Sequence, residues 1–173
     1  METGTNKIVL VGFMGTGKST VSRLLADELG WLRIDTDDEI VEREGRPIAA
    51  IFAEAGEESF RRIESEVIES VMNAPGPAVV ATGGGAPLAE RNRQAMLARG
   101  YVVALKADAS HIIARVQADP ARPLLAGDAE NRVPLLLEQR RSVYDFAHSI
   151  IDTTSMTAEE VAAAIMEGWK RRL

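Results

Sequence analysis

One stretch of eight residues, positions 12–19, constrains the fold of this chain more than any other feature. It reads GFMGTGKS and matches the pattern G-x-x-x-x-G-K-[ST] at every fixed position. An apolar run at residues 7–11 precedes it, and residues 19–29 follow with apolar side chains at helical spacing. A glycine-rich turn that binds nothing is the alternative, but the flanking strand and helix favour a phosphate-binding loop, hereafter the phosphate loop.

The residue types of the phosphate loop suit phosphate chemistry. Its backbone amides can point at phosphate oxygens, and the following helix adds the partial positive charge of its N-terminus. Lys18 can reach the outer phosphates, and the Ser19 hydroxyl can ligate Mg²⁺. We expect a nucleoside triphosphate to contact Gly15, Thr16, Gly17, Lys18, Ser19 and Thr20, and the phosphate loop alone does not identify the second substrate.

Composition narrows the class of protein further. With 173 residues, 46% of them hydrophobic and 27% charged, the chain fits a single globular domain over residues 1–173. A net charge of −6 without a dense Lys/Arg tract argues against nucleic acid as the main partner. The chain has no cysteine, no signal-type N-terminus and no apolar run approaching the ~18 residues that span a bilayer. We therefore expect a cytoplasmic protein with no membrane contact, and nothing demands more than a monomer.

Strand-like and helix-like segments alternate along the chain. Besides residues 7–11, the expected strands are residues 31–35, 78–82, 101–106 and 148–151. After the helix at residues 19–29, the expected helices are residues 37–44, 47–55, 57–72, 88–98, 109–118, 131–147 and 157–172, the last with a capping box between Thr157 and Glu160. This alternation predicts an α/β fold with a parallel five-stranded sheet between two layers of helices.

Two carboxylates follow the second expected strand. If the chain stays extended there, Asp35 and Asp37 point to the same side. One would then hold Mg²⁺, directly or through water, while the other would accept the proton of an attacking hydroxyl. Asp37 as the N-cap of the next helix is the alternative.

Two further segments are candidates for ligand contacts. Gly83, Gly84 and Gly85 follow the strand at residues 78–82 and would allow close approach of backbone amides to an anion. Arg61 either pairs with carboxylates on its own helix face or binds a substrate carboxylate, with Glu64 orienting it. The residues alone leave both open.

The least regular segment, residues 119–131, lies between two expected helices. It contains two prolines, a glycine and Arg122. Loops of this length in a compact domain are often functional lids, and two leucines argue against a fully solvated loop. We therefore expect a mobile lid here.

Together, these motifs resemble those of the shikimate kinase family over nearly the whole chain. The matching stretches are residues 12–20, 35–37, 51–52, 56–57, 60–61, 81–85 and 122–125, followed by Arg140 and Tyr144. The phosphate loop is common to many kinases, whereas the combination of the other motifs is much more specific. The resemblance implies a nucleoside-monophosphate-kinase-like fold and transfer of the ATP γ-phosphoryl group to the 3-hydroxyl of shikimate.

The resemblance also implies roles for single residues. Asp37 would bind the shikimate hydroxyls and act as base, within substrate-binding helices at about residues 37–72. Arg61 and Arg140 would bind the shikimate carboxylate, and Gly84 would add a backbone donor. Lys18 and Arg122 would stabilise the transferred phosphoryl group. Ser19 and Asp35 would serve Mg²⁺, the latter through water, and Arg115 would lie near the adenine.

Some alternatives remain at this stage. Arg141 could replace Arg140 at the substrate, although the spacing to Tyr144 favours Arg140. Thr154, Ser155 and Met156 stand where some family members carry a basic residue near the adenine, so a nucleotide contact there is in doubt. A gluconate or nucleoside monophosphate kinase is the nearest rival. A GTP-dependent switch lacks its [NT]-K-x-D signature, and an inactive module is disfavoured by the retained lysine and aspartates.

Overall fold

The computed structural model describes residues 6–118 and 128–173. Its single described sheet has the order β2-β3-β1-β4-β5, with every neighbouring pair parallel. The strands are β1 (Lys7–Gly12), β2 (Leu32–Asp35), β3 (Ala78–Ala81), β4 (Tyr101–Lys106) and β5 (Ser149–Asp152). The predicted α/β class is therefore confirmed. No described helix is long and apolar enough to cross a membrane.

Alternation along the central strand divides the core into two layers. Val9 and Val11 join one cluster of buried side chains, whereas Ile8 and Leu10 join another on the opposite face. All four side chains are fully buried. A parallel sheet covered on both faces requires apolar residues at both positions of the alternation, which explains the continuous apolar run of β1.

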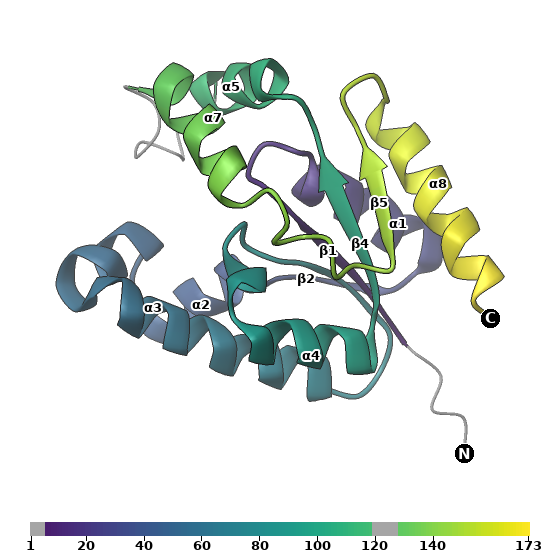
Figure 1. The fold of residues 1–173 in the computed structure, drawn as a ribbon. Coiled ribbons are helices and arrows are strands. Elements are labelled where there is room, and N and C mark those ends of the chain that lie inside the picture. The colour runs from purple at the N-terminus through teal and green to yellow at the C-terminus, as the bar shows by residue number, and fades with distance from the viewer. Residues whose placement is uncertain (1–5, 119–127) are drawn as a thin grey trace.

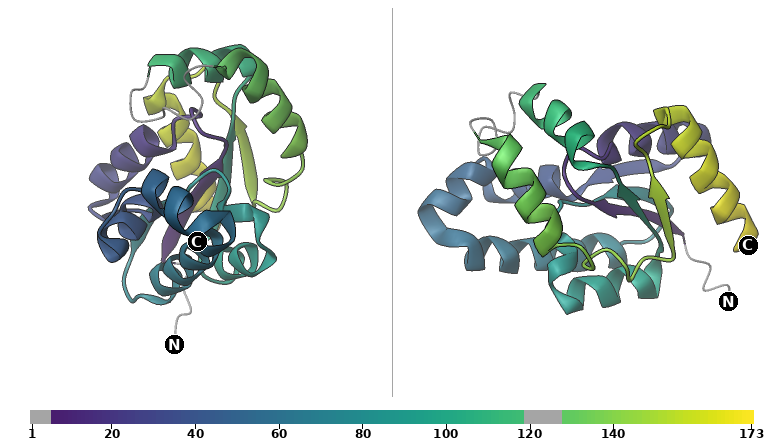
Figure 2. Two further views of the ribbon diagram at one scale, coloured as in Figure 1. Left: turned by 90° about the vertical axis from the view of Figure 1, so that its left-hand side faces the viewer. Right: turned by 45° about the horizontal axis from the view of Figure 1, so that its top comes forward.

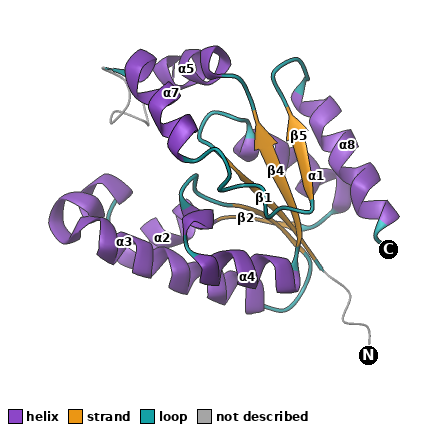
Figure 3. Ribbon diagram, viewed as in Figure 1, coloured by secondary structure: helices purple, strands orange, loops and turns teal. Residues whose placement is uncertain are grey.

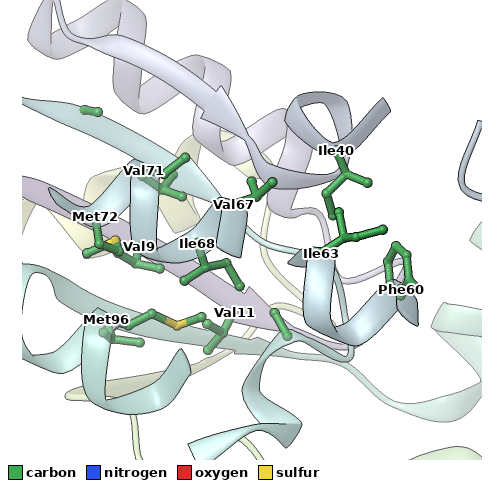
Figure 4. Close-up of a cluster of buried hydrophobic side chains, with 14 of the residues drawn as sticks. Val9, Val11, Ile40, Phe60, Ile63, Val67, Ile68, Val71, Met72 and Met96 are labelled. Carbon is green, nitrogen blue, oxygen red and sulfur yellow. The ribbon is translucent and has the colours of Figure 1, made fainter. Parts of the chain in front are cut away.

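Helices cover both faces of the sheet (Figure 1). One layer contains α2 (Thr36–Glu44), α3 (Ile48–Asn73) and α4 (Glu90–Arg99), and the other contains α1 (Lys18–Leu29) and α8 (Ala158–Arg171). Figure 4 shows the first layer, in which the apolar stripe of α3 packs with Val9 and Val11 of the sheet and with Met96 of α4. The helix α3 is broken at Gly56, as the two separately predicted helices require.

A third cluster lies at the carboxyl ends of the strands. The helices α5 (Ala109–Ala118) and α7 (Ala129–Gln139) pack together there around Phe13, whose side chain is 2% exposed. Both views in Figure 2 place this helix pair at one end of the molecule, away from the C-terminal end of α8. Phe13, the second residue of the phosphate loop, therefore anchors the loop against α5 and α7.

Most predicted elements are present, including the capping box in which Thr157 and Glu160 bond reciprocally. The helix predicted at residues 131–147 is wrong at its end, because α7 stops at Gln139 and a series of turns leads to β5 (Figure 3). Tyr144, Phe146 and Ala147 pack against the core in these turns, and that tertiary packing overrides helix propensity. A short 3₁₀ helix, η1 (Ala86–Leu88), stands where the helix predicted at residues 88–98 was expected to begin, and α4 starts at Glu90.

Candidate active site

The phosphate loop is a tight turn between β1 and α1. Gly17 is the N-cap of α1 at φ 101°, a left-handed conformation that side chains with a Cβ rarely adopt. The Lys18 ammonium donates hydrogen bonds to the carbonyls of Gly12 (2.6 Å) and Phe13 (2.8 Å). The buried Thr16 hydroxyl also donates to Phe13 (2.7 Å). These bonds close the loop on itself and hold the lysine cation beside the N-terminus of α1.

Two residues from other elements bind the backbone of this loop. Arg115 of α5 donates to the Gly15 carbonyl at 3.0 Å, and the Thr153 hydroxyl is 3.2 Å from the Thr16 carbonyl. Thr153, only 2% exposed, was not predicted as a site residue, although its position directly after β5 was a usable signal. The backbone N–H of Asp108 donates to Thr154, so this hydroxyl joins two loops in the structure.

The arrangement of the two aspartates differs from the expectation. The chain does not stay extended after Asp35, because α2 begins at Thr36. Asp35 is itself the N-cap, and its Oδ1 accepts from the backbone N–H groups of Asp37 (2.9 Å) and Asp38 (3.3 Å). The alternative in which Asp37 caps the helix is therefore wrong, and Asp37 lies in the first turn of α2.

The glycine run, Gly83–Gly85, lies where four segments of the chain meet. A Cβ on Gly83 would be 2.8 Å from Oδ1 of Asp37 and 3.3 Å from Oε2 of Glu64. One on Gly84 would be 3.5 Å from the Arg140 guanidinium, 3.4 Å from the Met14 nitrogen and 3.6 Å from the Gly12 oxygen, and one on Gly85 would overlap the Arg61 guanidinium. The absence of side chains here lets four charged groups and the phosphate loop approach one backbone segment.

These four charged residues, Asp37, Arg61, Glu64 and Arg140, form what we call the acceptor cluster. Arg61 donates to Oε1 of Glu64 at 2.9 Å and lies 3.7 Å from the exposed carboxylate of Glu57. Glu64 is 1% exposed, and burial raises the pKa of its carboxyl while the charge of Arg61 opposes that rise. Nε of Arg61 is buried and has no hydrogen-bond partner within the described parts of the chain. This Nε is the atom that faces Glu57 at 3.7 Å, so the Arg61–Glu57 contact is an ion pair without a hydrogen bond.

Arg140 and Arg141 point in different directions. The Arg140 guanidinium lies 5.7 Å from the Phe13 ring centre and beside Gly84. The Arg141 side chain is 81% exposed and pairs with Glu138. The Tyr144 hydroxyl donates to the Gly84 carbonyl at 2.7 Å, and burial raises its pKa while Arg140, its hydrogen-bond partner, opposes the rise. Tyr144 was predicted only as part of a motif, yet it connects the glycine run with Arg140.

The predicted magnesium ligands fit that ion in chemical type. Ser19 presents an exposed hydroxyl in the first turn of α1, and Asp35 presents a partly exposed carboxylate after β2. The described residues contain no group of three or more His, Cys, Asp or Glu side chains able to hold a metal. Mg²⁺ is usually held by one or two protein oxygens together with phosphates and water, so this sparse oxygen set suits a nucleotide-bound ion. Arg122 and residues 119–127 of the predicted lid lie outside the described residues.

Comparison with known proteins agrees with these features. The family model described as shikimate kinase matches residues 14–170. A shikimate kinase from Moorella thermoacetica is 44% identical over 94% of each chain, and one from Streptomyces coelicolor is 43% identical over 92% of this chain and 93% of its relative. The resemblance that the motifs indicated is confirmed.

Solved structures give the same result. A shikimate kinase from Acinetobacter baumannii, solved in complex with shikimate, superposes with a TM-score of 0.90 at 36% identity, covering 98% of this chain and 95% of that one. A gluconokinase from Sinorhizobium meliloti matches with a TM-score of 0.62 at 17% identity, covering 96% and 93%. The second likeness shows a shared fold alone.

Proposed function

Because this chain belongs to the shikimate kinase family, we propose that it transfers the γ-phosphoryl group of ATP to the 3-hydroxyl of shikimate, giving shikimate 3-phosphate and ADP. Such a reaction belongs to the shikimate pathway of aromatic amino-acid (chorismate) biosynthesis. One observation supports the assignment to this site above the others: the glycine run brings a carboxylate, Asp37, and two arginines, Arg61 and Arg140, against the phosphate loop. A ring acid with hydroxyls on one side and a carboxylate on the other matches that polarity.

At the acid end, Arg61 and Arg140 bind the shikimate carboxylate. The position of the Arg61 guanidinium against the Gly85 backbone supports this role, because it places a planar cation at the glycine run and a guanidinium binds a carboxylate through two parallel hydrogen bonds. Glu64 orients Arg61 through the 2.9 Å bond. Gly84 contributes a backbone donor, and Gly83 and Gly85 leave room for the ring.

At the hydroxyl end, Asp37 is the base. Its carboxylate accepts the proton of the 3-hydroxyl as that oxygen bonds to the γ-phosphorus and the bond from this phosphorus to the β–γ bridging oxygen breaks. Its position in the first turn of α2, beside Gly83, keeps it on the same side of the site as the phosphate loop. Helices α2 and α3 thus supply Asp37, Arg61 and Glu64 for the acceptor, and the turns after α7 add Arg140, all within one kinase domain.

At the nucleotide end, the phosphate loop binds ATP. The Lys18 ammonium, held above the loop by two carbonyls, balances the charge of the transferred group, and Arg115 lies beside the loop, where the adenosine part would leave it. Ser19 and, through water, Asp35 would hold Mg²⁺, which would supply charge neutralisation for the phosphates. The part assigned to Arg122 stays a prediction from the sequence. We further propose that the protein acts as a cytoplasmic monomer.

A coupled assay for ADP formation tests the proposal. Shikimate, gluconate and nucleoside monophosphates are compared at equal concentration with MgATP, and the Asp37→Asn variant serves as the control for the chemistry of this site. We expect shikimate-dependent turnover in the wild type alone. Turnover that is faster with gluconate or with a nucleoside monophosphate would contradict the proposed acceptor.

A further inference from the structure

The side chain of Arg33 contacts Asp35, one predicted magnesium ligand, and Ser22, which binds the backbone of the other, Ser19. Neither the motifs nor the proposed mechanism uses Arg33. Arg33 and Asp35 are two residues apart on β2, so their side chains share the face of the sheet that α1 covers. Nη2 of Arg33 is 3.7 Å from Oδ2 of Asp35, and Nε donates to the Ser22 hydroxyl of α1 at 2.9 Å. The Arg33 side chain is 22% exposed and that of Asp35 is 18% exposed.

Arg33 is anchored by Ser22, which also binds the backbone of the other predicted magnesium ligand, Ser19. Ser22 is fully buried, and its hydroxyl donates to the backbone carbonyl of Ser19 at 2.8 Å while it accepts from Arg33. One hydroxyl can do both. The guanidinium is therefore tied to α1 at Ser22, whose hydroxyl in turn binds the backbone carbonyl of Ser19, the other predicted ligand.

Both oxygens of Asp35 already have partners. Oδ1 accepts two backbone N–H groups as the N-cap of α2, and Oδ2 faces Arg33. The cap bonds fix the position of the carboxylate without help from Arg33. What Arg33 adds is positive charge, which lowers the negative potential that a divalent cation meets at Asp35.

We propose that Arg33 is the built-in counter-ion of Asp35 and weakens this carboxylate as a magnesium ligand. The proposal rests on the proposed function, since it takes Mg²⁺ with its nucleotide to be the ligand of Ser19 and Asp35. Arg33 acts through Asp35 and is a positioning residue.

Calorimetric titration with ADP, once with saturating Mg²⁺ and once with EDTA, tests the proposal without catalysis. The quantity compared is the dissociation constant of ADP with EDTA divided by that with Mg²⁺. A larger ratio means that the metal supports nucleotide binding more strongly. In Arg33→Met we expect this ratio to rise by roughly three- to tenfold, less at high salt, because a like charge near the metal has been removed. Arg33→Lys keeps the charge and should stay near the wild-type ratio.

Two further variants separate the possible failures. Arg43→Met removes a guanidinium from the exposed Arg43–Glu66 pair and should leave the ratio unchanged. Asp35→Asn keeps an N-capping side chain but loses the charge, and it should lower the ratio. If Asp35→Asn lowers the ratio while Arg33→Met leaves it unchanged or lowers it, the role of Arg33 is wrong and the magnesium site stands. If Asp35→Asn leaves the ratio unchanged, the magnesium role of Asp35 is wrong as well. A rise of the ratio in both Arg33→Met and Arg33→Lys would contradict a role for the charge of Arg33.

Discussion

The two halves of the candidate site are built differently. The phosphate loop comes from consecutive residues, and its internal bonds run from Thr16 and Lys18 to carbonyls within the same turn. The acceptor cluster takes its charged side chains from α2, α3 and the turns after α7, and the glycine run after β3 holds them together. The first half is local in sequence and made mostly of backbone groups, whereas the second exists only because distant segments meet.

This difference teaches where substitutions should act. Nucleotide binding depends on backbone amides and a helix end, so it should tolerate changes in the acceptor cluster. Acceptor binding depends on a few charged side chains in a crowded space, and no second side chain repeats the contact that each of them makes. Nucleotide binding therefore serves as the internal reference for the effect of acceptor-cluster variants on turnover and KM.

The largest effect is expected from Asp37→Asn. Loss of the base should lower kcat by roughly 10²- to 10⁴-fold, while the dissociation constant of MgADP changes by no more than about twofold. Asparagine has the same shape, so folding should be retained, which circular dichroism checks. Near-normal turnover in a folded variant would remove Asp37 from the chemistry.

A pair of neighbouring arginines gives the next contrast. Arg140→Ala should raise the KM for shikimate by roughly 10- to 100-fold, because hydrogen bonds between charged groups are lost. The KM for ATP should hardly move. Arg141→Ala is the matched control, since its side chain is 81% exposed and paired with Glu138. Equal effects of the two variants would mean that the surface, and not the acceptor cluster, sets the KM.

Gly85→Ala tests the close packing of the glycine run. The added methyl overlaps the Arg61 guanidinium, whose Cζ would be 2.7 Å away, while φ of −93° at Gly85 suits alanine. We expect a cost of about 1–3 kcal/mol in unfolding free energy and a higher KM for shikimate, from displacement of Arg61. In an Arg61→Ala background the same change should cost much less, and equal costs in both backgrounds would place the clash elsewhere.

The smallest effect is expected in the pH dependence of stability at Glu64. Because burial raises the pKa of this carboxyl in the folded state, its favourable contribution is complete below the pKa of the unfolded chain and is lost as the pH rises through the folded value. Glu64→Gln cannot ionise, so its unfolding free energy relative to wild type should increase as the pH rises above the ordinary range of a glutamate carboxyl.

Urea unfolding at several pH values measures the Glu64 effect. Glu57→Gln is the control, because it removes the 67% exposed carboxylate on the other side of Arg61 and should show a smaller trend. The KM for shikimate in Glu64→Gln is expected to rise even where stability improves. A pH-independent stability difference would mean that Glu64 is ionised with no net burial cost.

The sequence predicted most helices and strands correctly, but it predicted fewer of the contacts that connect them. Thr157 and Glu160 predicted the start of α8 correctly because a capping box is a local pattern. The extended Asp35–Asp37 arrangement was wrong, since the first aspartate uses its own side chain to begin α2. The sequence predicted no role for Arg33. Its two-residue spacing from Asp35 places both side chains on one face of β2, but only the contact with Ser22 of α1 fixes the position of the guanidinium.

What the sequence determined by itself is the phosphate loop between β1 and α1, with Lys18 and Ser19 at its end, because a turn of eight residues is specified by short-range backbone geometry. It also identified the family, through motifs whose order along the chain is distinctive. The tertiary structure showed that Arg140, which the spacing to Tyr144 already favoured, turns inward while Arg141 stays exposed. It alone decided that Tyr144 reaches Gly84 and that the Arg61 guanidinium lies against Gly85. Those facts depend on how segments as far apart as Phe13 and Arg140 pack, and packing of distant side chains leaves no local pattern in a single sequence.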